Sequence, residues 1–113
     1  MHWTYKTKPD LTQFGFVYCI TNLNTNKAYI GCKQYFNYKK GKKKSESNWK
    51  IYMGSSKHLL EDIEKIGKKK FKFEIIAEFK NKRSLRYYEC YYQMKYNVLT
   101  ATLEDTTLTA YYN

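Results

Sequence analysis

Long apolar runs are missing from the sequence, and cysteine and histidine are scarce. No run approaches the roughly 20 apolar residues that a membrane-spanning helix needs, which excludes a membrane-spanning protein. The three cysteines, Cys19, Cys32 and Cys90, are odd in number and form no C-x-x-C pair. The two histidines lie far apart in the sequence, so the pattern argues against a zinc cage. We expect the cysteines to be reduced and to pack in the core as small apolar side chains.

Signs of secretion and of several domains are also lacking. The length of 113 residues suits one small domain with one modest core. The first ten residues are polar and contain no apolar stretch of the kind found in a signal peptide. We therefore expect a cytoplasmic protein that does not associate with membranes.

Acidic residues are few beside the lysines. The chain has 21 basic and 10 acidic residues, a net charge of +11, and only Arg83 and Arg86 are arginine. An AT-rich genome also enriches lysine, so the alternative of an interaction protein with no polyanion partner stays open. The clustering is more informative, because Glu46 is the only acid between Lys33 and Lys50. Basic stretches interleaved with aromatic residues favour contact with a phosphate backbone. The lysines that we expect to bind nucleic acid are Lys39, Lys40, Lys42, Lys43 and Lys44.

The apolar pattern predicts an α+β domain with the order strand, strand, helix, strand, helix. Two aromatic and β-branched segments flank a short polar turn, which is typical of an antiparallel hairpin. The first helix follows from apolar residues at helical spacing, with Ser55 or Ser56 as its N-cap and Gly67 at its end. The predicted strands cover residues 14–21, 28–33 and 71–79, and the predicted helices cover residues 57–66 and 84–96.

We expect the remaining segments to be irregular. Residues 1–13 contain Pro9 and read as an N-terminal arm. The lysine-rich stretch 34–48 has no helical period and reads as a mobile loop. Residues 98–113 are rich in threonine and weakly patterned, so we expect a C-terminal tail after a domain that spans residues 14–97.

Several polar side chains could act together, although each has a simpler explanation. The hairpin brings Tyr18 and Tyr29 close to opposite each other, which could equally be an aromatic pair on the core. Glu89 lies in the most aromatic stretch of the chain. It could equally belong to a polar stripe on the solvent-facing side of a helix. Ser55 and His58 lie near the start of a helix, which binds phosphate readily but also needs an ordinary cap.

Two tripeptides at a fixed distance carry a resemblance to a known family. Residues 16–18 read Phe-Val-Tyr, and after ten residues 29–31 read Tyr-Ile-Gly. This pattern resembles the signature of the GIY-YIG nuclease family. Phe16 stands where that family has glycine, although Gly15 lies one position earlier. The run 49–59 is also similar to phage-type members that resemble homing endonucleases, which suggests a phage protein acting in its host cell.

The resemblance implies both a fold and a reaction. The family's fold is a small three-stranded antiparallel sheet flanked by helices, and its reaction is metal-dependent hydrolysis of DNA phosphodiester bonds. Tyr18 and Tyr29 match the signature tyrosines, one of which activates water in the family. Glu89 matches the glutamate that holds one divalent cation, Mg²⁺ or Mn²⁺, and Asn97 could match an asparagine that often follows it. Such a cation commonly takes one or two protein carboxylates, so a single glutamate is compatible with a site.

One departure from the family concerns the basic residue near the phosphate. The family usually has an arginine on the helix after Tyr-Ile-Gly, and this chain has none before Arg83. We expect a lysine in its place, in the order Lys33, Lys57, Lys39. The residues that we expect to contribute further acid, base or DNA contacts are His58, Tyr52, Ser55 and Ser56.

A second departure concerns size. Homing-type members usually join the nuclease to a separate DNA-binding region, so we expect either a minimal nuclease or one module of a longer protein. The alternative function is a non-catalytic nucleic-acid-binding module of the same fold.

Overall fold

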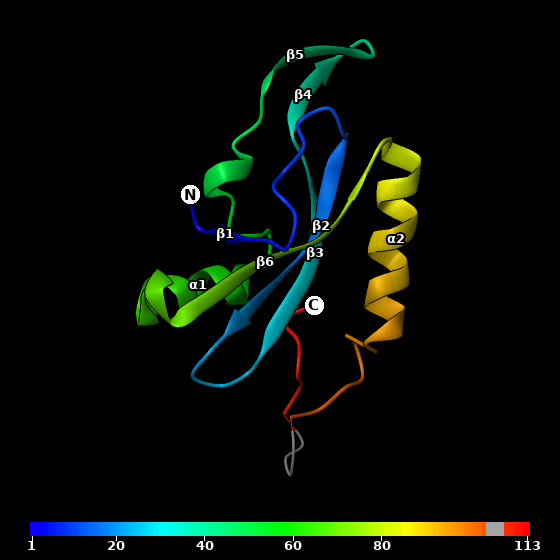
Figure 1. The fold of residues 1–113 in the computed structure, drawn as a ribbon. Coiled ribbons are helices and arrows are strands. Elements are labelled where there is room, and N and C mark those ends of the chain that lie inside the picture. The colour runs from blue at the N-terminus through cyan, green and yellow to red at the C-terminus, as the bar shows by residue number, and fades with distance from the viewer. Residues whose placement is uncertain (104–107) are drawn as a thin grey trace.

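A mixed four-stranded sheet forms the centre of the protein (Figure 1). We analysed a computed structural model, which describes residues 1–103 and 108–113. The strand order is β1-β6-β2-β3, with β2 antiparallel to both of its neighbours and β1 parallel to β6. The predicted three-stranded antiparallel sheet is therefore confirmed, with one short strand added at its edge. The strands are β1 (Trp3–Thr4), β2 (Gly15–Asn22), β3 (Ala28–Gln34) and β6 (Phe71–Phe79).

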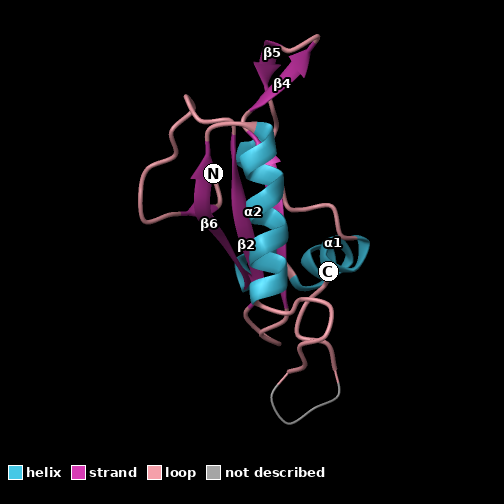
Figure 2. Cartoon of the chain, turned by 90° about the vertical axis from the view of Figure 1, so that its right-hand side faces the viewer, coloured by secondary structure: helices cyan, strands magenta, loops and turns pink. Residues whose placement is uncertain are grey.

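Two α-helices lie on opposite sides of this sheet, as Figure 1 shows, and Figure 2 looks onto the second of them. Helix α1 (Lys57–Ile66) has the predicted bounds, because the Ser56 side chain accepts a hydrogen bond from the Leu59 N–H and Gly67 ends the helix at φ 103°. Helix α2 (Lys82–Lys95) begins two residues earlier than predicted, because the Asn81 side chain caps it by accepting a hydrogen bond from the Ser84 N–H. Short 3₁₀ helices, η1 (Trp49–Ile51) and η2 (Lys68–Lys70), flank α1 in the sequence. Neither α-helix has the length and apolarity of a membrane span, among the residues described.

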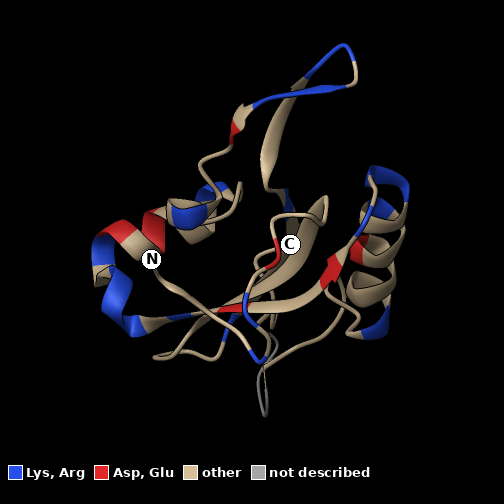
Figure 3. Ribbon diagram, turned by 45° about the horizontal axis from the view of Figure 1, so that its top comes forward, with Lys and Arg blue, Asp and Glu red and all other residues tan. Residues whose placement is uncertain are grey.

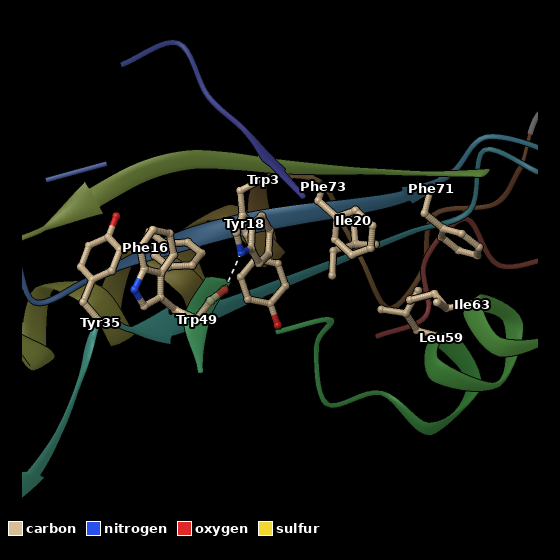
Figure 4. Packing of buried hydrophobic residues seen from close by; sticks show 10 residues of the cluster. All are labelled: Trp3, Phe16, Tyr18, Ile20, Tyr35, Trp49, Leu59, Ile63, Phe71 and Phe73. Atoms are coloured by element: carbon tan, nitrogen blue, oxygen red, sulfur yellow. Dashed lines mark hydrogen bonds between the residues drawn. The ribbon is translucent and has the colours of Figure 1, made fainter. Parts of the chain in front are cut away.

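Alternating side chains of β2 build a separate core on each face of the sheet. Phe16, Tyr18 and Ile20 pack with residues of α1 and η1 in a largely aromatic cluster (Figure 4). Val17, between them, belongs to a smaller cluster that includes Leu85 of α2. This period of two is what a strand buried on both faces requires.

The N-terminal segment, expected as an arm, contributes to the aromatic cluster. Trp3 is 4% exposed and its ring lies 5.2 Å from those of both Phe16 and Tyr18. Its indole N–H donates a 2.6 Å hydrogen bond to the carbonyl oxygen of Trp49. Residues 1–4 therefore close the core on the α1 side of the sheet.

The C-terminal segment lies along the outer edge of β3. Ala28 forms a parallel bridge with Tyr111, and the Ile30 N–H donates to the side-chain oxygen of Asn113. The Tyr112 hydroxyl donates a 2.6 Å hydrogen bond to Asp62 of α1. The tail thus covers the first half of the β3 edge and leaves the second half, from Gly31 onward, open to the candidate site.

The expected irregular loop at residues 34–48 is wrong. Strands β4 (Phe36–Lys39) and β5 (Lys42–Glu46) form an antiparallel ribbon, which continues outward from β3. A two-residue turn joins them, with φ of 53° at Lys40 and 78° at Gly41. Both positive values are typical of a type I′ hairpin turn, for which glycine at the second position is favoured. The ribbon has little apolar surface to bury, so its sequence carries only a weak strand pattern.

The cysteines are free thiols, but they are not all in the core. Cys19 and Cys32 are partly buried against the smaller cluster, whereas Cys90 is exposed on the outer face of α2. The expected burial of Cys90 is wrong, because it lies about 100° around the helix from its neighbour Glu89, which points inward.

The first prediction concerns Trp3. We expect Trp3→Ala to lower the free energy of unfolding by about 3–5 kcal/mol, since it leaves a cavity beneath two aromatic rings. Denaturant unfolding measures this value, with Tyr5→Ala, at a side chain that is 45% exposed, as the control. Equal unfolding midpoints for the two variants would contradict a structural role for the N-terminal segment.

Candidate active site

Tyr18 passes across Gly31, its partner on β3. A Cβ atom at residue 31 would lie 2.5 Å from the Tyr18 hydroxyl oxygen and 2.7 Å from Cζ. The glycine of Tyr-Ile-Gly therefore gives the Tyr18 ring room to cross the edge of the sheet. A register shift between Val17 and Tyr18, in the pairing of β2 with β6, lies at the same point. Bulges of this kind change the direction of a side chain and are frequent beside active sites.

Tyr29 and Tyr52 surround the Tyr18 ring. The Tyr29 ring lies 6.2 Å from it, and the Tyr52 ring meets it edge-on at 6.1 Å. The Tyr29 hydroxyl is hydrogen-bonded to Ser55 Oγ at 3.1 Å. The Lys33 ammonium lies 4.1 Å from the centre of the Tyr52 ring. These contacts join the hairpin to the segment before α1.

These side chains share a polar pocket with Glu89 of α2. The pocket has a volume of about 280 Å³, and Arg86 also lines it. The Glu89 carboxylate is 21% exposed and lies 3.8 Å from the Arg86 guanidinium. The six predicted site residues that the structure brings together in this pocket are Tyr18, Tyr29, Lys33, Tyr52, Ser55 and Glu89.

Burial determines the protonation of two groups in the pocket. It raises the pKa of Tyr18 far above the ordinary tyrosine value, and the neighbouring Tyr29, Tyr52, Cys32 and Glu89 add to this effect. Burial, helped by the charge of Glu89, also raises the pKa of Cys32 to about 12. Both groups therefore carry their protons at neutral pH.

Burial also acts on Lys33, whose pKa it lowers from the ordinary lysine value. This cation is thus partly stripped of water, which strengthens its interaction with any anion that enters the pocket.

Other predicted site residues lie outside the pocket. His58 is 80% exposed at the side chain and faces Glu61 of its own helix at 3.9 Å. Lys57 is exposed at the start of α1. Ser56 and Asn97 line a larger neighbouring cavity, which shares Tyr29 with the pocket. The remaining predicted side chains lie on the ribbon, namely Lys39, Lys40, Lys42, Lys43 and Lys44.

Sequence reasoning missed Arg86. The family pattern places the basic residue on the helix after Tyr-Ile-Gly, which led to lysines between Lys33 and Lys57. Arg86 lies one helical turn before Glu89, so side chains at these positions share a face of α2. The spacing of three residues between an arginine and the candidate glutamate was the signal that could have found it.

Comparison with known proteins identifies the family to which the chain belongs. The sheet order, the paired tyrosines and the helical glutamate are those expected of a GIY-YIG nuclease domain. The sequence matches, over residues 3–113, the family described as "Putative endonuclease segE, GIY-YIG domain". The chain therefore belongs to the GIY-YIG nuclease family, which confirms the resemblance and implies a nuclease with DNA as its substrate. No curated protein and no solved structure matches the chain at a significant level.

The second prediction concerns the buried hydroxyl of Tyr18. Its pKa is raised in the folded state, so its contribution to stability is complete below the ordinary pKa of 10.0 and is lost as the pH rises further. We expect the free energy of unfolding above pH 10 to fall less steeply in Tyr18→Phe, by about 1.4 kcal/mol per pH unit. Denaturant unfolding from pH 8 to pH 11.5 measures the slope. Equal slopes in the parent protein and the variant would contradict the protonated, buried state of Tyr18.

Proposed function

We propose that this protein is a divalent-metal-dependent DNA endonuclease, in which Tyr18 positions the attacking water and Glu89 holds one cation. The observation that carries the proposal is the single polar pocket shared by Tyr18, Tyr29, Lys33 and Glu89. These side chains come from two strands and a helix that are far apart in the sequence. Their shared pocket supports a joint role better than the simpler explanation of each residue alone.

The neutral state of Tyr18 bears on how it would act. A tyrosine can activate water as a phenolate or as a neutral hydroxyl that relays a proton. Because burial raises its pKa, the neutral form is favoured. In our proposal the Tyr18 hydroxyl takes a proton from the water as the water oxygen bonds to phosphorus, and it gives its own proton to a solvent water in the pocket. The bond between phosphorus and the leaving oxygen breaks, and that oxygen takes a proton from solvent. The Tyr29 hydroxyl, hydrogen-bonded to Ser55 Oγ, lines the same pocket as Tyr18 and would orient this exchange.

Glu89 is suited to bind a hard divalent cation. Its carboxylate is partly exposed to a polar pocket, which leaves room for the waters that Mg²⁺ or Mn²⁺ keeps. No group of three or more His, Cys, Asp or Glu side chains occurs within residues 1–103 and 108–113, so Glu89 would be the principal protein ligand. A bound cation would neutralise charge on the phosphate and assist the leaving oxygen.

Arg86 and Lys33 supply the positive charge for the phosphate. The Arg86 side chain is 64% exposed and can leave Glu89 to face an entering phosphate. Its guanidinium offers the forked donors that a lysine lacks. Lys33 of β3, whose ammonium lies against the Tyr52 ring, adds a second cation to the same pocket. We propose that this pair replaces the arginine that the family carries on the preceding helix.

The altered signature does not obstruct this proposal. Phe16, at the position of the family's first glycine, is fully buried in the aromatic cluster and does not line the pocket. A Cβ atom at Gly15 would lie 2.8 Å from the Gln34 Cα and 3.0 Å from Leu85, so this glycine permits the close approach of β3 and α2. DNA affinity would come mainly from the ribbon lysines Lys39, Lys40, Lys42 and Lys44, because the Lys43 ammonium lies against the Phe36 ring. Tyr52 and Ser55 would lie near the scissile phosphate, and Asn97 and Ser56 at the edge of the neighbouring cavity.

The third prediction separates catalysis from binding. We expect Tyr18→Phe to cut plasmid DNA about 10²–10⁴-fold more slowly with Mg²⁺, because it loses the proton-transfer group. Glu89→Gln should abolish cutting, and Tyr29→Phe should remove most of it. All three should stay folded and bind DNA as the parent protein does.

Glu61→Gln, an exposed carboxylate on α1, is the matched control and should cut normally. EDTA should stop the parent protein, and added Mg²⁺ or Mn²⁺ should restore it. Normal cutting by Glu89→Gln would refute the metal assignment. A parent protein that binds DNA but never cuts it would support the non-catalytic module instead.

The fourth prediction concerns Arg86. We expect Arg86→Gln to lower kcat about 10²–10³-fold, a loss typical of removing one group that stabilises charge in the transition state. Arg86→Lys should recover part of the rate, since lysine keeps the charge without the fork. Arg83→Gln, exposed at the start of the same helix, is the control. Equal rates for Arg83→Gln and Arg86→Gln would show that Arg86 does not act on the phosphate.

A further inference from the structure

The β4–β5 ribbon is fixed relative to the pocket by contacts at its base. Tyr38 stacks on Phe14 with ring centres 5.4 Å apart and planes 19° from parallel. The Gln34 side chain donates to the Phe36 carbonyl oxygen at 2.8 Å. Ser47, at the other strand, donates from its hydroxyl to the Gln34 carbonyl oxygen at 2.6 Å. The ribbon is therefore a defined extension of the sheet (Figures 1 and 2).

The two faces of the ribbon differ in character. On one face, the Asn37 side chain donates a 3.2 Å hydrogen bond to the Ser45 hydroxyl oxygen. Two residues further along the strand, on the same face, Lys39 lies opposite Lys42. The opposite face carries the ribbon's aromatic side chains, with the Lys43 ammonium 4.4 Å from the centre of the Phe36 ring. We name the first the Asn37 face and the second the Phe36 face.

The Asn37 face is continuous with the candidate active site. Asn37 itself lines the pocket, together with Gln34 and Lys33. The Lys39–Lys42 pair lies roughly 7 Å further along the ribbon, because two strand residues span about that distance. A nucleic acid whose phosphate entered the pocket would therefore meet this face next.

The lysines of the ribbon have no ion-pair partner among the residues that the structure describes. Lys39 and Lys42 are directly opposite each other, an arrangement that destabilises a strand pair unless an anion compensates it. Glu46, the ribbon's one acid, pairs with Lys50 outside the ribbon at 3.6 Å. No ribbon lysine forms a salt bridge with any residue that the structure describes. Figure 3 shows this concentration of basic residues towards the tip. The pattern complements a polyanion.

We propose that the β4–β5 ribbon lies in the major groove of duplex DNA beside the cleavage site, with its Asn37 face towards the DNA. This inference rests on the proposed nuclease function and adds the form of the substrate. A two-stranded ribbon fits the major groove, which is about 12 Å wide, but not the minor groove of about 6 Å. Single-strand binders present exposed aromatic rings for stacking, whereas the rings here pack against Phe14 and Lys43 on the other face.

The fifth prediction compares two neighbouring lysines on opposite faces. In the Glu89→Gln background, which binds without cutting, we expect Lys42→Gln to weaken binding to a short duplex about tenfold at low salt. Its salt dependence should also fall, by about 0.9 in the slope of log K against log[salt], for one lost phosphate contact. Lys43→Gln, the same charge change one residue further on, should alter affinity less than about twofold. Equal effects of the two substitutions would overturn the orientation of the ribbon.

Competition on the Glu89→Gln protein with an intact ribbon tests the groove independently of the ribbon variants. Methyl green, which occupies the major groove, should displace the protein from duplex DNA, and netropsin, which occupies the minor groove, should not. Single-stranded DNA should bind at least tenfold more weakly than the duplex. Displacement by netropsin alone, or equal affinity for the single strand, would overturn the proposal.

These measurements also distinguish the inference from the function on which it rests. If the parent protein cuts duplex DNA but the two lysine variants bind alike, the ribbon proposal fails and the nuclease function stands. If the parent never cuts but the variants differ as expected, the ribbon proposal stands and the nuclease function fails.

Discussion

The passage of a buried tyrosine across a glycine at the sheet edge is the contact on which the site depends. Tyr18 is 1% exposed, yet its hydroxyl reaches the pocket because Gly31 has no side chain to block the ring. Tyr29 and Tyr52 pack around that ring and line the same pocket. The aromatic core therefore determines where the candidate catalytic hydroxyl lies. Burial, which places it there, also keeps it protonated.

Residues at the two ends of the chain support this contact from both sides. Trp3 packs directly on the Tyr18 ring from the N-terminal segment. Asn113 pairs with the edge of β3 at Ile30, next to Gly31. The family match over residues 3–113 likewise includes both segments. The site is thus built on a core to which almost the whole chain contributes.

The sequence predicted the elements whose buried face gives a period, and it missed the ribbon and the two-residue strand β1, which show none. The stripe of α1 and the alternation in β6 were sufficient for their bounds, because burial on one face imposes a period. The β4–β5 ribbon escaped notice since most of its side chains are exposed lysines, and its turn signal was a single Gly41. Trp3 was missed because two isolated strand residues carry no period at all.

The site residues that could be predicted also differ from those that could not in whether a local sequence pattern marks them. Tyr18 and Tyr29 were found because a spaced motif marks them, and Lys33 followed from its closeness to that motif. Glu89 was found because it is the lone acid in the most aromatic stretch and matches the family's glutamate. Arg86 was missed because its place in the pocket depends on where α2 packs against β3, which is a tertiary contact. His58 and Lys57 were chosen for their closeness to a helix start, but both side chains point to solvent instead of the pocket.

The central claim, that Tyr18 and Glu89 serve one reacting centre, can be tested by a double-mutant cycle on the rate of DNA cleavage. Groups that act as a unit show strongly non-additive losses, so the variant with both Tyr18→Phe and Glu89→Asp should be no slower than the slower single variant. Glu89→Asp is used because it keeps a carboxylate and therefore a measurable rate. Losses that multiply independently would contradict a shared centre.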